Sequence, residues 1–100
     1  MPEGRPYRLH PEVWLEIEAA DDWYLERSVD ASAEFIAPIS DAFETISQAP
    51  QRWPIYLHGT QRLVLHRFPF SIIYLDDPDV LSIVAVAHSK RKPGYWKTRL

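Results

Sequence analysis

The sequence has no cysteine and only three glycines among its 100 residues. Without cysteine the chain forms no disulfide, no thiolate zinc site and no cysteine nucleophile, which fits the reducing cytoplasm, where we expect the protein to reside. The chain also lacks glycine-rich nucleotide loops, the G-x-S-x-G serine motif and the H-E-x-x-H zinc motif, so the standard catalytic signatures are missing. Its four histidines show no metal-ligand spacing, and we expect no metal and no cofactor.

Long apolar runs are absent as well. The longest notable run is IVAVA, residues 83–87, whereas a helix needs roughly 20 apolar residues to cross a bilayer. The opening segment, MPEGRPYRL, has no apolar region behind its charges, so we expect neither a secretion signal nor a membrane partner. A length of 100 residues with 46% hydrophobic content supports one core, which predicts a single domain over residues 1–100.

The charge present in the sequence is distributed unevenly. Residues 1–61 carry four arginines against eleven acidic residues, and residues 62–100 carry seven lysines or arginines against three aspartates. This asymmetry predicts an anionic partner at the basic half, either a nucleic acid or an acidic peptide. An ordinary solvated surface is the alternative interpretation.

Two amphipathic helices are expected after a short extended segment at residues 6–10. The first covers residues 11–27, and its core-facing stripe consists of Val13, Ile17, Ala20 and Tyr24. Acidic side chains such as Glu16 and Glu18 are expected on its solvent side.

The second helix begins at a cap, Ser28 or Asp30, and ends before Pro50. Because the link between the helices is short, they are expected to pack as an antiparallel hairpin. Pro38 removes a backbone hydrogen bond inside the second helix and predicts a kink there or a later helix start.

Three segments rich in β-branched and aromatic residues follow, at residues 62–68, 70–75 and 80–88. They predict a three-stranded antiparallel meander. The last segment is apolar on both faces, so it should be central, with the helices on one side and the chain's own tail or a partner on the other. The expected fold is therefore α+β: a short N-terminal strand, a helical hairpin, a meander packed against the helices, and a basic C-terminal tail.

Candidate catalytic side chains all lie after residue 61. They are Arg62, Arg67, His88 and Tyr95. An antiparallel meander places the ends of its first and third strands at one edge, which would bring Arg67 and His88 together. An imidazole that moves a proton and guanidinium groups that stabilise a phosphorane would suit RNA cleavage. The tail aromatics Tyr95 and Trp96 could stack on bases, or fold back as an apolar lid on the central strand.

Three motifs carry a resemblance to a known family: PxxWP at residues 50–54, RFPFSIIY at residues 67–74, and VAVAHSKRKPGYWKTR at residues 84–99. In this order and spacing the chain resembles the RelE/ParE superfamily of bacterial type II toxin–antitoxin toxins, especially the ParE-type branch. The resemblance covers nearly the whole chain. It implies a toxin that a cognate antitoxin holds inactive in a heterocomplex, with the antitoxin in a hydrophobic groove beside the meander and the hairpin.

The resemblance implies two possible targets. ParE-like members inhibit DNA gyrase, whereas RelE-like members cut messenger RNA on the ribosome with basic residues of the meander. The first predicted strand here brings no lysine, and Leu75-Asp76-Asp77 stands where the family often has a basic residue, which favours a non-enzymatic ParE-type toxin. The alternatives are a ribonuclease that uses the candidate catalytic residues, and an inactive module that only binds antitoxin. The expected target-binding residues are Lys90, Arg91, Lys92, Trp96, Lys97 and Arg99.

Overall fold

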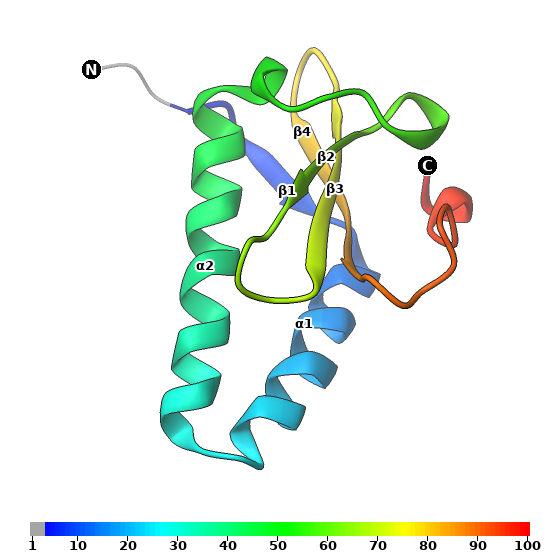
Figure 1. Ribbon diagram of the computed structural model, residues 1–100. Coiled ribbons are helices and arrows are strands. Elements are labelled where there is room, and N and C mark those ends of the chain that lie inside the picture. Colours follow the sequence, from blue (N-terminus) through cyan, green and yellow to red (C-terminus); the bar gives the residue numbers. More distant parts are fainter. Residues whose placement is uncertain (1–3) are drawn as a thin grey trace.

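A four-stranded sheet separates a helical hairpin from the C-terminal tail in the computed structural model, which describes residues 4–100 (Figure 1). The helices and strands, in chain order, are β1 (Tyr7–Leu9), α1 (Pro11–Leu25), α2 (Val29–Gln48), β2 (Gln61–Val64), β3 (Phe70–Asp76) and β4 (Leu81–His88). The strand order is β1-β4-β3-β2, with β1 parallel to β4 and the other pairs antiparallel. The predicted α+β arrangement is confirmed. Residues 1–3, which begin the segment examined for a secretion signal, lie outside the described range.

The first helix, α1, starts where His10 caps it. The His10 imidazole accepts a hydrogen bond from the Glu12 backbone N–H at 3.1 Å, and Pro11 occupies the first turn, where a missing N–H costs nothing. The predicted stripe lies against the core, with one residue fully buried and three partly buried: Val13, Ile17, Ala20 and Tyr24.

The second helix, α2, runs without interruption through Pro38 to Gln48, so the later start offered as an alternative is wrong. Ser28 caps it by accepting a hydrogen bond from the Ala31 backbone N–H at 2.9 Å. The proline costs about 3 kcal/mol. Burial of Phe35, Ile39 and Ile46 on either side of it contributes about 1.5–3 kcal/mol each, which offsets that cost. Within residues 4–100, no helix is both long and apolar enough to span a membrane.

The meander forms as predicted, except that its first strand is shorter. Strand β2 ends at Val64, and residues 66–69 form a bend that the Leu65 N–H closes by donating to the Phe70 carbonyl at 3.0 Å. Pro69 has no N–H to donate to a ladder, which explains why the strand cannot continue to it. Arg67 consequently lies in the bend and not in the strand.

A bulge in β4 directs two consecutive apolar side chains, Val84 and Ala85, to the same face of the sheet. Ala85 pairs with Ile73 and Ile83 pairs with Tyr74, so Val84 is left over between them. Both Val84 and Ala85 are buried on the face away from the helices, where Trp96 of the tail packs on them. The central strand is therefore covered by the helices on one side and by the chain's own tail on the other, as Figure 1 shows.

Candidate functional site

An open groove of about 580 Å³ lies between α1, the adjoining ends of β3 and β4, and the tail. We call it the apolar groove. Its α1 wall includes Leu15, Ala19 and Trp23, and its floor includes Phe70 and Val86. Leu15 is 58% exposed and Trp23 is 51% exposed, so much of this wall is uncovered apolar surface. Such a surface is typical of a site for another molecule.

The opposite wall of the apolar groove carries one exposed guanidinium, that of Arg91, beside His88 and Tyr95, whereas an exposed carboxylate, that of Glu12, lies on the α1 wall. The His88 imidazole packs edge-on against the Phe70 ring at 5.0 Å between centroids, and its Nδ1 accepts a hydrogen bond from the Lys90 backbone N–H. The Arg91 guanidinium lies 3.8 Å above the centre of the Tyr95 ring. These side chains face the exposed apolar residues of α1 across the groove. The geometry therefore suits a segment with apolar and acidic side chains.

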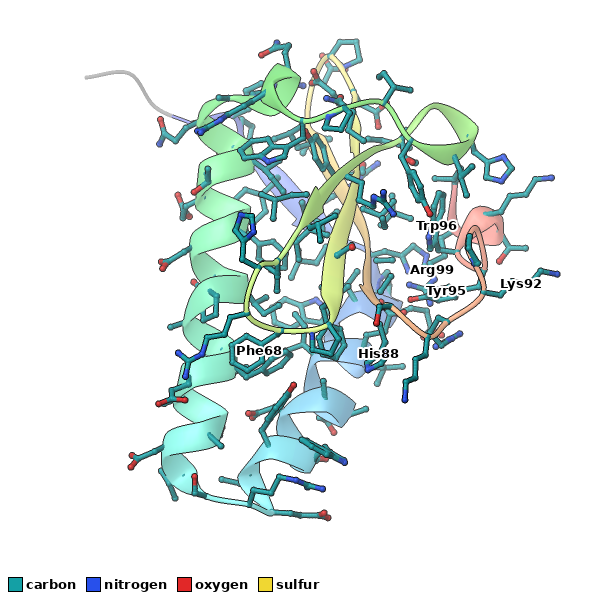
Figure 2. All side chains as sticks on the ribbon, in the orientation of Figure 1. Phe68, His88, Lys92, Tyr95, Trp96 and Arg99 are labelled. Atoms are coloured by element: carbon teal, nitrogen blue, oxygen red, sulfur yellow. The ribbon has the colours of Figure 1, made fainter. Side chains whose placement is uncertain are left out.

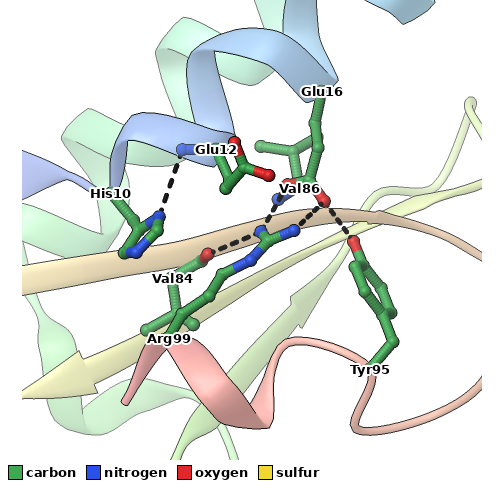
Figure 3. A network of polar contacts seen from close by, with 7 residues as sticks. All are labelled: His10, Glu12, Glu16, Val84, Val86, Tyr95 and Arg99. Atoms are coloured by element: carbon green, nitrogen blue, oxygen red, sulfur yellow. Dashed lines mark hydrogen bonds and ion pairs between the residues drawn. The ribbon is translucent and has the colours of Figure 1, made fainter.

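A mostly buried carboxylate on α1, that of Glu16, anchors the tail (Figure 3). The two oxygens of Glu16 accept hydrogen bonds from both terminal nitrogens of Arg99, each at 3.0 Å, and from the Val86 backbone N–H at 3.0 Å. The same carboxylate accepts a 2.5 Å hydrogen bond from the Tyr95 hydroxyl. Arg99 also donates to the Val84 carbonyl at 3.1 Å. Glu16 thus joins α1, β4 and the tail at one point.

The environment of this network shifts two pKa values. Burial, together with the Glu16 carboxylate, raises the pKa of the Tyr95 hydroxyl well above its usual value. For Arg99, burial opposes the charge, but the hydrogen bonds and ion pair with Glu16 outweigh it and raise the pKa. Tyr95 therefore stays protonated at neutral pH, and its hydroxyl donates that proton to Glu16 in a hydrogen bond. A hydroxyl in this state is unsuited to act as a general base.

Two residues predicted to contact a target are instead occupied inside the protein. Trp96 is 1% exposed and packs against Ile73 and Val84. Arg99 is only 12% exposed at its side chain and is paired with Glu16. Figure 2 shows both side chains directed at the body of the protein, whereas Lys92 extends from the tail. Trp96 therefore forms the apolar lid that one of the two interpretations expected, whereas Tyr95 is only partly buried and lines both cavities.

The remaining target-binding candidates lie on the surface of the tail. They are Lys90, Arg91, Lys92 and Lys97, and all four are exposed. Arg91 and Lys92 line cavities, whereas Lys90 and Lys97 do not.

Arg67 lines neither of the cavities that His88 lines, in contrast to the expectation from strand order. Its guanidinium pairs with Glu34 of α2 at 2.9 Å, on the helical side of the molecule. Both side chains are largely exposed, so this pair contributes at most about 1 kcal/mol. The ends of β2 and β4 do lie at one edge, since Val64 pairs with Ser71 and Ser71 with Ala87, but the bend carries Arg67 away from it.

The other three candidate catalytic residues line a second, smaller cavity of about 160 Å³, which we call the cationic pocket. They are Arg62, His88 and Tyr95, and Arg91 and Lys92 line the same pocket. Its floor is the tail-facing side of the sheet. The pocket shares His88, Arg91 and Tyr95 with the apolar groove, so these residues form a wall between the two cavities. Within residues 4–100, no cluster of three metal-ligating side chains occurs.

Glu16 is the residue that sequence reasoning placed wrongly. The prediction put it on the solvent side of α1 with Glu18, yet its side chain is only 13% exposed. The signal was available in the spacing, because Glu16 follows Val13 by three residues and precedes Ala20 by four, which places it within the buried stripe. A single acid among apolar positions indicates a buried partner, here Arg99.

Comparisons with known proteins agree with the fold. A solved structure described as the chromosomal ParDE toxin–antitoxin system from P. aeruginosa superposes with a TM-score of 0.76 at 16% sequence identity, covering 86% of this chain and 97% of that one. No curated protein matches the chain. The family model for the ParE toxin of the type II toxin–antitoxin system parDE matches residues 7–93. The chain therefore belongs to the ParE toxin family of type II toxin–antitoxin systems.

Proposed function

We propose that this ParE-family toxin inhibits growth by acting on DNA gyrase, and that a cognate antitoxin holds it inactive by filling the apolar groove. One observation supports the antitoxin part: the groove has the half-exposed apolar side chains of Leu15 and Trp23 on one wall and Arg91 on the other. An amphipathic antitoxin segment places apolar side chains against α1 and carboxylates against the tail. Burial of the exposed halves of Leu15 and Trp23 contributes on the order of 2 kcal/mol.

A binding experiment with matched variants tests this part of the proposal. Leu15→Glu puts a carboxylate on the apolar wall, where it repels the acids of the antitoxin and removes apolar contact. Leu25→Glu is the control, because Leu25 lies on the same helix, is 48% exposed and lines no part of the groove. Titration with purified antitoxin should show affinity lowered at least about tenfold by Leu15→Glu and little changed by Leu25→Glu. Equal affinities for the two variants would remove the groove as the antitoxin site.

Gyrase is favoured as the target by family membership and by the state of the candidate nuclease residues. Arg67 lines neither cavity, and the Tyr95 hydroxyl is engaged by Glu16. The set that a ribonuclease would need is thus incomplete. Purified toxin should inhibit supercoiling of relaxed plasmid by gyrase, and added antitoxin should restore it. Supercoiling that proceeds normally at toxin concentrations that stop growth would contradict the gyrase assignment.

One observation supports the ribonuclease alternative: a single pocket contains Arg62, His88 and Tyr95. It predicts new transcript ends after induction of the toxin, and loss of those ends in His88→Ala. Absence of transcript cleavage together with altered supercoiling in the same cells supports gyrase. Induction with no growth defect at all supports the inactive antitoxin-binding module.

A further inference from the structure

We infer that the cationic pocket binds a terminal phosphate group, the dianionic group of inorganic phosphate, a nucleotide or the phosphorylated end of a nucleic acid. This inference does not depend on the antitoxin groove. The side chains that line the cationic pocket carry an excess of positive charge. Arg62, Arg91 and Lys92 line the pocket together with His88, and no carboxylate does. The net charge of the whole chain is −3, so this local excess of positive charge is not a property of the overall composition.

The protein's own acids do not neutralise these cations. Within residues 4–100, the ion pairs are Arg5–Asp76, Arg67–Glu34 and Arg99–Glu16. None of them includes a side chain of the cationic pocket. Like charges around one small cavity repel each other, and the repulsion is stronger near the low-dielectric protein than in open water. A compact anion of charge −2 relieves that repulsion.

Each of the two guanidinium groups in the pocket stacks on an aromatic ring. Arg62 lies 4.0 Å above the centre of the Tyr56 ring, and Arg91 lies 3.8 Å above that of Tyr95. Stacking restricts a guanidinium to a plane parallel to the ring and leaves its N–H edge able to donate. The forked N–H groups of arginine match the geometry of phosphate oxygens. Tyr95 is itself fixed by its hydrogen bond to Glu16, so the wall that carries Arg91 is anchored to α1.

The size of the pocket favours the end of a molecule over a whole one. Its volume of about 160 Å³ is well below the roughly 300 Å³ at which pockets begin to enclose drug-sized ligands. Its floor is formed by short side chains of β3 and β4, including Ser71 and Ala87, with the tail and Tyr56 as walls. A terminal phosphate can enter end-on and leave the rest of its molecule outside. An internal phosphodiester carries one charge and has chain on both sides, so it fits this pocket less well.

Titration of the full chain with inorganic phosphate, followed by ³¹P NMR, tests the inference. We expect saturable binding at one site. Arg62→Gln and Arg91→Gln should each weaken it by at least about tenfold, because each removes a charge-assisted hydrogen-bond donor. Arg52→Gln is the matched control, since Arg52 is an exposed arginine that also stacks on an aromatic ring, that of Trp53, but lines neither cavity, and it should change the affinity by less than about twofold. Circular dichroism establishes that the variants are folded.

A second set of titrations separates the sources of the phosphate. The probes are adenosine monophosphate and a short single-stranded DNA with either a 5′-phosphate or a 5′-hydroxyl. Equal affinity for the nucleotide and the phosphorylated DNA identifies the phosphate group itself as the ligand, and tighter binding of the phosphorylated DNA identifies a nucleic-acid end. The inference is overturned if inorganic phosphate does not saturate the protein, if Arg52→Gln loses as much affinity as Arg62→Gln, or if the 5′-hydroxyl DNA binds as tightly as the phosphorylated one.

Discussion

At the scale of single residues, Glu16 determines where the C-terminal tail lies. It is a mostly buried carboxylate that pairs bidentately with Arg99 and accepts further hydrogen bonds from Tyr95 and a backbone N–H of β4. A buried ion pair adds little net stability when compared with apolar residues of the same shape. Removal of one partner is costly, however, because the other charge remains buried without compensation.

Glu16→Gln should therefore lower the free energy of unfolding by about 3 kcal/mol, because Arg99 then lacks a counter-charge. Glu18→Gln is the control on the same helix, and as an exposed residue it should change stability by no more than about 0.5 kcal/mol. Urea unfolding followed by circular dichroism measures both. Equal stability of the two variants would contradict the structural role of Glu16.

Tyr74 provides a pH prediction at the same scale. Its buried hydroxyl donates to the Pro50 carbonyl at 2.5 Å, and burial raises its pKa to about 12. Below pH 10 the phenol is protonated in both the folded and the unfolded chain. Above pH 10 the unfolded chain ionises first, so stability should fall as the pH rises from about 10 to about 12. Tyr74→Phe should show a smaller fall in unfolding free energy over this interval, and an identical fall would contradict the assignment.

At the scale of elements, the tail acts as the second cover of the sheet. The β4 bulge turns both Val84 and Ala85 toward the tail, and Trp96 fills the space above them. A sheet face with this many buried apolar side chains requires such a cover. The tail thus has a structural role as well as carrying exposed cations.

Trp96→Ala should lower the free energy of unfolding by about 3–5 kcal/mol, because it removes a fully buried aromatic side chain and leaves a cavity. Trp14→Ala is the matched control, since Trp14 is 61% exposed on α1. It should cost less than about 1 kcal/mol. Thermal unfolding of the two variants compares them directly, and similar melting temperatures would mean that the tail does not contribute to the core.

The sequence predicted the elements well because their signals are local. Apolar spacing identified both helices, and β-branched runs identified the three strands of the meander. The positions of single side chains were harder to predict. Glu16 and Arg99 are 83 residues apart, and no local pattern links them. Arg67 lies outside the expected cluster because strand β2 ends at Val64, three residues before it. The three-residue strand β1 was expected, but its parallel pairing with Leu81–Ile83 depends on tertiary packing.

At the scale of the whole molecule, the acidic and basic halves are connected by ion pairs. Glu16 binds the tail and Glu34 binds the bend after β2, so two of the cations that the sequence places in the basic half are already paired. The exposed cations that remain include Arg91 beside the apolar groove and Lys92 at the cationic pocket. The molecule therefore presents two adjoining cavities, the larger one mainly apolar on its α1 side and the smaller one lined by three cations, with His88, Arg91 and Tyr95 between them.

The central claim is that the antitoxin lies in the apolar groove, and hydrogen–deuterium exchange of the toxin with and without bound antitoxin tests it most directly. We expect binding to slow exchange in α1 and in residues 88–95, which form the two walls of the groove. Strand β2, at the edge of the sheet opposite β1, should be unaffected. Protection of β2 with no change in α1 would contradict the account.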